Sequence, residues 1–399
     1  MKKFKITHQN GEARSGEIRI NGKKLETPFL YPVLAFFCGG NWSSKFGGGI
    51  YRQIKENFLM KKKFQKYFSG IMTSIAQLND FPVTKKKLNE YISKSIHDWF
   101  NFDGVLFVDS GGFKLLTNGG IKGQDFEIKS AEEVLYYQKK FGANILVSLD
   151  YPISPNLPKN EINKRIEFSI SNAVYLLHNK PKNTLTYIAI HGYSKKSLKL
   201  FMSRLLYNLE KEALSLKKID GIALGSLVPL KSNILKILEI VKGCKEVLYE
   251  FDMNSVPLHV FGISSTLMPL LVMMGVDTFD SSTYLYSGIK GVYLTKGLKR
   301  MNVTKIKRGM CNCQVCKKKD YFMLMKKSSQ KIGSLEGSFI AMHNLITFTK
   351  EVQTLQEIIK NSDESYITKF IQNRYSHSPI IRKGVIYLIE KLRYNKWSI

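Results

Sequence analysis

The 399-residue sequence contains few cysteines, few acidic side chains and no long apolar run. Its five cysteines are too few and too unevenly placed for a disulfide scaffold. The longest apolar stretch, around residues 268–274, is much shorter than the ~20 residues that span a bilayer. Residues 1–11 lack the apolar core of a secretory leader. These absences predict a cytoplasmic, reducing location and no membrane association.

The overall composition is typical of a large globular protein, and its charge indicates a polyanionic partner. Hydrophobic residues make up 44% of the chain and aromatic residues 12%, which excludes a disordered or collagen-like protein. The chain carries 61 Lys and Arg against 32 Asp and Glu, a net charge of +29. Because so basic a surface attracts phosphate polymers, nucleic acid is the first partner to consider.

Eight short apolar or β-branched runs recur along the first three quarters of the chain, and helix-patterned segments separate most of them. Strands that are apolar on both faces and alternate with helices indicate a parallel sheet covered on both sides. Eight such units can close into a (β/α)8, or TIM, barrel, and an open doubly wound α/β sheet is the alternative. The predicted strands are residues 29–37, 68–75, 104–109, 143–150, 185–191, 221–228, 258–263 and 276–280.

The polar residues at the ends of these runs favour the barrel. In barrel enzymes the site lies at the C-terminal face and is assembled from the ends of several strands. The polar or glycine-containing strand ends are Asp109-Ser110-Gly111-Gly112, Asp150, His191-Gly192, Gly225-Ser226, Gly262 and Asp280. We therefore predict that these residues, scattered in sequence, form one site.

Four segments are predicted in chain order. Asn21-Gly22 suits a two-residue turn, so residues 1–28 are predicted to form an N-terminal β-hairpin. The catalytic barrel is predicted at 29–295, and a zinc-binding subdomain at 296–350. A basic helical segment at 351–399 is predicted to pack on the barrel, since no low-complexity linker precedes it.

Three cysteines, Cys311, Cys313 and Cys316, lie within six residues, and His343 follows them. Four soft or borderline ligands suit tetrahedral Zn²⁺, and a full set of protein ligands leaves no position for a catalytic water. The spacing therefore predicts a structural zinc site. The alternatives are incidental free thiols and, for His343, a core position in an apolar helix. The two other cysteines, at positions 38 and 244, are expected to be inert buried thiols.

Four motifs resemble those of the tRNA-guanine transglycosylases, and the likeness covers roughly residues 25–345 in order. Asp109-Ser110-Gly111-Gly112-Phe113 resembles the family's DSGG[FY]Q motif, and Phe279-Asp280 resembles its nucleophile strand. Val260-Phe261-Gly262-Ile263 is similar to its MGVG-like strand, and the cysteine–histidine spacing to its zinc site. The resemblance implies an enzyme that exchanges guanine in a polynucleotide for a 7-deazaguanine (preQ0-like) base through a covalent intermediate.

The resemblance also implies roles for the matching residues. Asp280 would be the ionised nucleophile that attacks the sugar C1′, and Asp109 the general acid and base. Asp150 would read guanine, because a carboxylate accepts both N1–H and N2–H. On sequence alone, each of the three could instead be a capping or loop-solvated carboxylate. The other substrate-binding residues that we assign are Ser110, Gly111, Gly112, Phe113, His191, Gly225, Leu227, Phe261 and Gly262.

Aromatic and basic side chains complete the predicted site. Phe113 and Phe261 would sandwich the flipped base by stacking, although both could equally be barrel core. The lysines beside the cysteine cluster are candidate contacts to the nucleic-acid backbone. In the alternative interpretation they form an ordinary solvated face. These lysines are Lys317, Lys318, Lys319, Lys326 and Lys327.

Several departures from the family pattern bear on the nucleic acid. Lys114 stands where the family has Gln, and His191-Gly192 where its tRNA enzymes usually show Gln-Gly-Gly. Residues 281–286 replace the segment that engages tRNA, and residues 225–229 are similar to a bacterial and phage branch that modifies DNA. We therefore predict base exchange in DNA. The same exchange on tRNA and a non-catalytic nucleic-acid-binding subunit are the alternatives, and a homodimer is one assembly that the sequence leaves open.

Overall fold

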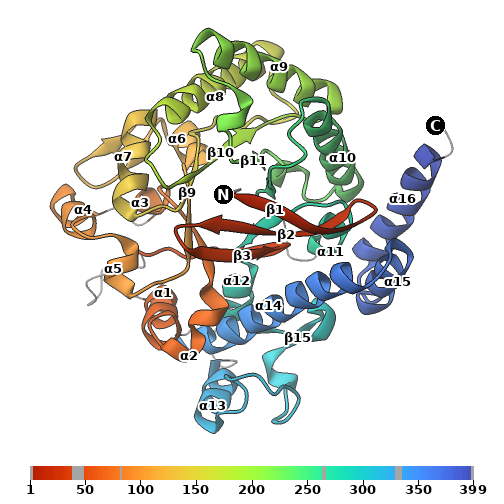
Figure 1. Cartoon of the computed structure of the whole chain (residues 1–399). Helices are drawn as coiled ribbons and strands as arrows, with labels where there is room; N and C mark the ends of the chain where they lie inside the picture. Colours follow the sequence, from red (N-terminus) through yellow and green to blue (C-terminus); the bar gives the residue numbers. More distant parts are fainter. Residues whose placement is uncertain (1–2, 38–48, 81–82, 263–266, 329–334, 397–399) are drawn as a thin grey trace.

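The computed structural model describes residues 3–37, 49–80, 83–262, 267–328 and 335–396, and a parallel eight-stranded barrel lies at its centre (Figure 1). Each strand pairs in parallel with the next, β13 returns to β4, and a bridge between Val33 and Met72 joins β4 to β5. The predicted barrel is therefore confirmed. Its strands are β4 (Phe29–Pro32), β5 (Gly70–Ser74), β6 (Val105–Asp109), β9 (Ile145–Val147), β10 (Leu185–Ile190), β11 (Gly221–Leu224), β12 (Leu258–Val260) and β13 (Thr278–Ser281).

Helices surround the barrel. The stretch at residues 84–100 contains two helices and not one, because Ser95 caps the second one in a reciprocal capping box with Asp98. The helices between strands are α1 (Gly49–Ile54), α2 (Lys62–Gln65), α3 (Gln77–Asp80), α4 (Lys85–Tyr91), α5 (Ile96–Phe100), α6 (Gly112–Asn118), α7 (Ala131–Phe141), α8 (Lys159–Asn179), α9 (Lys195–Lys211), α10 (Ile234–Glu250) and α11 (Met268–Met273). A short β7–β8 pair (Ile121–Lys122, Glu127–Ile128) follows α6.

A three-stranded antiparallel sheet covers the N-terminal end of the barrel (Figure 1). Its strands are β1 (Phe4–Asn10), β2 (Ala13–Ile20) and β3 (Lys23–Thr27). The predicted hairpin corresponds to β2 and β3, which turn at Asn21-Gly22 with positive φ at both residues. Strand β1 was missed because its side chains are mostly polar and exposed. Phe4, Ile18 and Leu25 pack with residues of the barrel interior, so this end is filled and a site must lie at the other.

A buried ion pair fastens the sheet to the barrel. Arg14 of β2 donates from Nε to Asp277 Oδ1 at 2.9 Å and from Nη2 to Oδ2 at 2.5 Å, and both side chains are buried. Asp277 Oδ2 also accepts the backbone N–H of Leu258 at 2.7 Å. The pair therefore links β2, β12 and the start of β13.

Replacing Arg14 by alanine should lower the free energy of unfolding by about 3–5 kcal/mol, because Asp277 would be left charged and buried. Urea unfolding followed by circular dichroism measures this change. Arg19→Ala is the matched control: Arg19 pairs with Glu17 on the surface, and its loss should cost about 0–1 kcal/mol. Equal effects of the two substitutions would contradict the proposed anchor.

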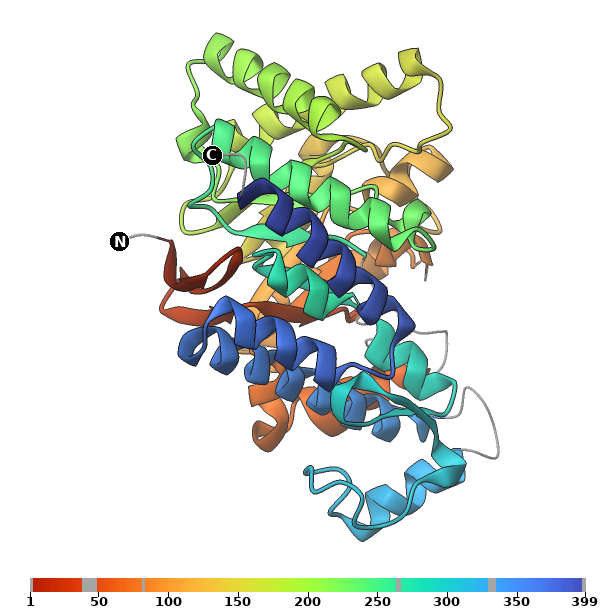
Figure 2. The same ribbon diagram turned by 90° about the vertical axis from the view of Figure 1, so that its right-hand side faces the viewer.

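The remaining elements lie against one side of the barrel (Figures 1 and 2). They are α12 (Thr283–Ile289), β14 (Val292–Leu294), β15 (Arg300–Asn302), α13 (Lys319–Lys327), α14 (Gly337–Asn361), α15 (Glu364–Arg374) and α16 (Pro379–Lys396). Helix α14 continues through residue 350, where we predicted a domain boundary. Gln356 of α14 donates to the carbonyls of Glu26 and Pro28, which ties this helix to the N-terminal sheet. Among the described helices, none has the length and apolarity needed to cross a bilayer.

Candidate active site and metal centre

Three acidic residues meet at the C-terminal mouth of the barrel. Asp109 ends β6, Asp280 lies in β13, and Asp150 follows β9 by three residues. The negative charges of Asp150 and Asp280 both contribute to raising the pKa of Asp109, so the three carboxylates lie in one electrostatic environment. The structure thus brings together the acids that the sequence places at separate strand ends.

Asp109 has the pKa of an acid that exchanges a proton near neutrality. Burial, and then the charge of Asp150, raises the pKa of Asp109 from 3.8 to about 7. Two hydrogen bonds oppose this rise: Ser74 Oγ donates to Oδ2 at 2.8 Å, and the Gly111 N–H donates to the same oxygen at 3.1 Å. Gly111 supplies this bond from a left-handed conformation, with φ of 78°, that favours glycine.

Asp280 has one carboxylate oxygen that is held and one that is open. Oδ1 accepts the backbone N–H of Gly262 at 2.8 Å, and His259 Nε2 lies 3.5 Å from it. The imidazole of His259 is completely buried, and its Nδ1 lies 2.9 Å from Thr278 Oγ1. In the part of the chain that the structure describes, Oδ2 of Asp280 makes no hydrogen bond, so this oxygen is available to a ligand.

Both carboxylate oxygens of Asp150 have a close polar neighbour. Ser110 Oγ donates to Oδ1 at 3.0 Å, and His191 Nε2 lies 3.2 Å from Oδ2. Gly112 packs against it so closely that a Cβ there would lie 2.1 Å from the Asp150 carbonyl oxygen. Only glycine therefore fits at position 112.

The remaining predicted substrate residues differ in exposure. Phe113 is 63% exposed at the start of α6, whereas Phe261 is half-buried and packs beside His259 with ring centroids 4.6 Å apart. Leu227 is buried, and Gly225 lies against the ring of His191. Their contact with a base stays a prediction, as does the sandwich of Phe113 and Phe261. Ile263, the last residue of the predicted seventh strand, lies outside the described residues.

The five lysines predicted to contact nucleic acid lie in α13 or directly before it. Lys317, Lys318 and Lys319 are exposed, and so is Lys327. Lys326 differs, because its Nζ donates to the carbonyl of Thr304 at 2.6 Å and so joins α13 to the segment after β15. Four of the five are therefore oriented toward solvent, and Lys326 also has a structural contact.

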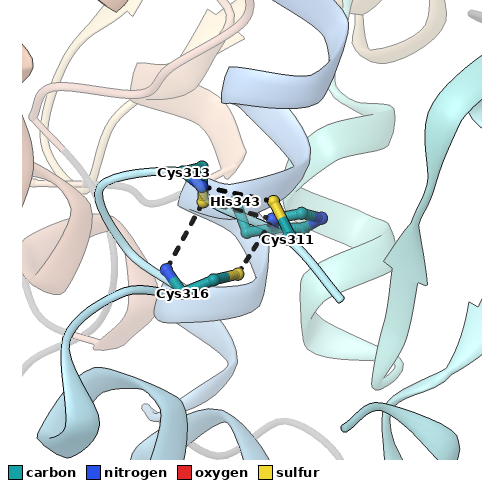
Figure 3. A group of neighbouring side chains, drawn as sticks. All are labelled: Cys311, Cys313, Cys316 and His343. Carbon is teal, nitrogen blue, oxygen red and sulfur yellow. Dashed lines mark hydrogen bonds between the residues drawn. The ribbon is translucent and has the colours of Figure 1, made fainter. Parts of the chain in front are cut away.

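The cysteine cluster forms a compact four-donor site (Figure 3). The three thiol sulfurs and a ring nitrogen of His343 all lie within 4.8 Å of one another. His343 Nδ1 is 3.5 Å from Cys313 Sγ and 3.3 Å from Cys316 Sγ. Tetrahedral zinc with Zn–S of about 2.3 Å and Zn–N of about 2.0 Å requires donor separations of this size. The residues present therefore fit a metal ion.

The hydrogen bonds of His343 leave its Nδ1 able to bind a metal ion. Its Nε2 lies 2.7 Å from the Leu294 carbonyl, which can only accept, so the proton is on Nε2 and the lone pair of Nδ1 faces the thiols. Tyr293 stacks on the ring with centroids 3.7 Å apart. Cys244 is a buried thiol in α10, as expected, and burial raises its pKa to about 12. Cys38 lies outside the described residues.

Sequence reasoning missed three side chains of the mouth, Ser74, His259 and Tyr193, whereas Ser226 was among the strand-end residues predicted to form the site. Ser74 does show a signal, because it is a hydroxyl at the end of a barrel strand. His259 offered none, since it lies within a predicted strand whose other residues are apolar. Its position toward Asp280 depends on how neighbouring strands align, which the sequence does not reveal.

Fold and site together define a parallel barrel with three carboxyl groups at its C-terminal mouth and a Cys3His metal-type cluster in the segment that follows the barrel. The family model "Queuine tRNA-ribosyltransferase" matches residues 57–376. The chain therefore belongs to the queuine tRNA-ribosyltransferase (TGT) family, and the resemblance to the tRNA-guanine transglycosylases is confirmed at that level.

Three curated relatives from archaea are each named tRNA-guanine(15) transglycosylase. The chain is 27% identical to that of Methanococcus aeolicus, over 90% of this chain and 50% of the relative. It is 27% identical to that of Nanoarchaeum equitans, over 96% and 86%, and 25% identical to that of Pyrococcus furiosus, over 99% and 60%. The chain thus spans half to three fifths of the Methanococcus and Pyrococcus proteins. These names give no support to the predicted DNA-modifying branch.

Proposed function

We propose that the protein is a guanine transglycosylase that replaces guanine in tRNA by a 7-deazaguanine base. The observation that carries this proposal is the pairing at one mouth of a carboxyl group with a pKa of about 7 and a carboxylate with one open oxygen. The names of the relatives favour tRNA, which was our alternative, over DNA, which was our first prediction.

In the proposed reaction, Oδ2 of Asp280 attacks C1′ of the target nucleotide and the C1′–N9 bond breaks. Asp109, in its acid form, gives its proton to the departing guanine. The incoming 7-deazaguanine then loses its N9 proton to the Asp109 carboxylate and attacks C1′, which releases Asp280. The first half-reaction leaves Asp280 bonded to the sugar and Asp109 deprotonated, and the second half-reaction returns both acids to their starting states.

Asp150 would select the base in both halves of the exchange. Its oxygens accept hydrogen bonds from the N1–H and N2–H of guanine, and adenine, with no N–H at N1, offers no such pair. The Cys3His cluster would hold zinc, which in a four-coordinate site stabilises the fold around it. The exposed Lys317, Lys318, Lys319 and Lys327, together with Lys326, are proposed to contact tRNA phosphates, which would offset part of the cost of extruding the base.

Incubation with radiolabelled guanine, unmodified tRNA and guanine-containing duplex DNA tests the proposed function. We expect label to enter tRNA. Incorporation into DNA alone would replace the tRNA proposal by the DNA alternative. Binding of either nucleic acid without incorporation would instead support the non-catalytic subunit.

The proton-transfer role of Asp109 predicts a specific pH shift. The acid form is populated below a pKa of about 7, so exchange should fall as the pH rises through that value. Ser74→Ala removes a hydrogen bond that lowers this pKa, so the pKa should rise and the descending limb of the rate should move to higher pH. Rates of guanine incorporation between about pH 5 and about pH 9, roughly two units to each side of that pKa, measure the shift.

Ser93→Ala is the control for this shift, because Ser93 donates to a backbone carbonyl at a partly exposed turn and does not contact the site. Its profile should coincide with that of the unmodified protein. A Ser74→Ala profile that moves to lower pH, or does not move, would refute the assignment of the limb to Asp109.

A further inference from the structure

A buried histidine, a strained serine and a tyrosine form a connected network behind Asp150. His191 has no exposed surface, and its Nε2 lies 3.2 Å from Asp150 Oδ2 but off the hydrogen-bond direction, so in this geometry the two form a close polar contact and not a hydrogen bond. Its other ring nitrogen, Nδ1, lies 2.9 Å from Ser226 Oγ. Ser226 and Tyr193 are partly exposed, and the network contacts Asp150 through the buried His191.

The hydrogen bonds around Ser226 determine which nitrogen of His191 carries the proton. Ser226 Oγ accepts the backbone N–H of Ile153 at 2.9 Å, so its own proton is free to go to His191 Nδ1. The proton of a neutral His191 is then on Nε2 and directed toward Asp150. The opposite tautomer would place a nitrogen lone pair 3.2 Å from a carboxylate oxygen, which is repulsive.

The backbone conformation around Ser226 keeps its hydroxyl close to His191. Ser226 has φ of 63°, a left-handed conformation that costs energy in a residue other than glycine. Tyr193 fixes the strained turn, since its hydroxyl lies 2.7 Å from the Ile153 carbonyl and 3.0 Å from the Ser226 carbonyl. A Cβ at Gly225 would lie 2.8 Å from the ring of His191, so this glycine makes room for the imidazole.

We propose that His191 and Ser226 are positioning residues that orient the Asp150 carboxylate for base selection, with Ser226 fixing the imidazole tautomer that donates to Asp150. The proposal rests on the proposed function, in which Asp150 accepts N1–H and N2–H of guanine. Ser110 donates to one oxygen of Asp150 and His191 Nε2 lies 3.2 Å from the other, so both oxygens have a polar neighbour before a base arrives. His191 would act through Asp150 and would not touch the base.

Selectivity for the guanine amino group gives a readout that a merely structural role would not change. Hypoxanthine is guanine without the N2 amino group. If the Asp150 carboxylate rotates, guanine should lose more affinity than hypoxanthine does, so the preference for guanine should fall. In Ser226→Ala we expect the ratio of the hypoxanthine inhibition constant to the KM for guanine to fall about tenfold, the equivalent of one lost hydrogen bond. His191→Leu should show at least the same fall, and His191→Gln, which keeps an N–H donor, a smaller one.

Ser148→Ala is the matched control, because Ser148 is also a buried hydroxyl that accepts a backbone N–H, from Ala189 at 3.1 Å. Its selectivity ratio should equal that of the unmodified protein. In the His191→Leu background, Ser226→Ala should change the ratio no further, since the two residues act as one unit. Additive effects, or an unchanged ratio in Ser226→Ala, would overturn the proposal.

A measurement that does not depend on activity separates this proposal from the proposed function. Nitrogen NMR of protein labelled at its seven histidines reports which ring nitrogen is protonated. We expect His191 to be protonated at Nε2 in the unmodified protein and to become a mixture of tautomers in Ser226→Ala. A proton on Nδ1 in the unmodified protein would refute the network. If NMR shows the expected tautomers but the protein incorporates no guanine, only the proposed function is refuted.

Discussion

Base exchange should fall by at least about 10⁴-fold when Asp280 is replaced by asparagine, because the amide oxygen cannot form the bond to C1′. Asparagine keeps the shape of the side chain and an oxygen that can accept the Gly262 N–H. The fold should therefore be preserved, and the melting temperature should change little. Initial rates of labelled guanine incorporation into tRNA measure the loss.

Asp103→Asn is the control for this substitution, since Asp103 is 97% exposed and lies outside the barrel mouth. It should exchange guanine at the rate of the unmodified protein. Exchange by the Asp280→Asn variant within tenfold of that rate would mean that another group attacks the sugar.

Loss of one cysteine of the metal cluster should have the largest effect on stability. Cys316→Ala removes one of four donors, and the metal contributes its binding free energy to folding. We expect loss of one zinc per chain and a fall of at least about 4 kcal/mol in the free energy of unfolding. Elemental analysis of the purified protein and urea unfolding measure the two effects.

Cys244→Ala separates loss of metal from loss of a buried thiol. Cys244 is also buried but lies in α10, away from the cluster, so its replacement should retain the metal and cost about 1 kcal/mol. Full metal content in Cys316→Ala, or equal destabilisation by the two substitutions, would contradict the metal site.

The barrel could be predicted because its strands are local and strongly patterned. Seven of the eight apolar runs contain one strand of the barrel completely, and β13 extends one residue beyond the eighth run. The three carboxylates could be placed together because strand ends of a closed parallel barrel meet at one face. The division of residues 84–100 into two helices could also have been predicted, since Ser95 and Asp98 have the spacing of a capping box.

Other features depend on contacts that no local pattern encodes. Strand β1 shows little apolar alternation and is held by its pairing with β2. The approach of His259 to Asp280, and of His191 to Asp150, follows from the alignment of neighbouring strands. The prediction of DNA gave single departures, such as Lys114, more weight than the likeness of the whole chain, and the names of the relatives favour the tRNA alternative.

The central claim is that Asp280 becomes bonded to the sugar while Asp109 serves the base at the same mouth. It is tested most directly by quenching the protein with tRNA in denaturant, digesting both components and analysing the peptides by mass spectrometry. We predict a nucleotide that has lost guanine, attached to the peptide that contains Asp280 and absent from the Asp280→Asn variant. A nucleotide attached to another residue, or the same adduct in that variant, would contradict the account.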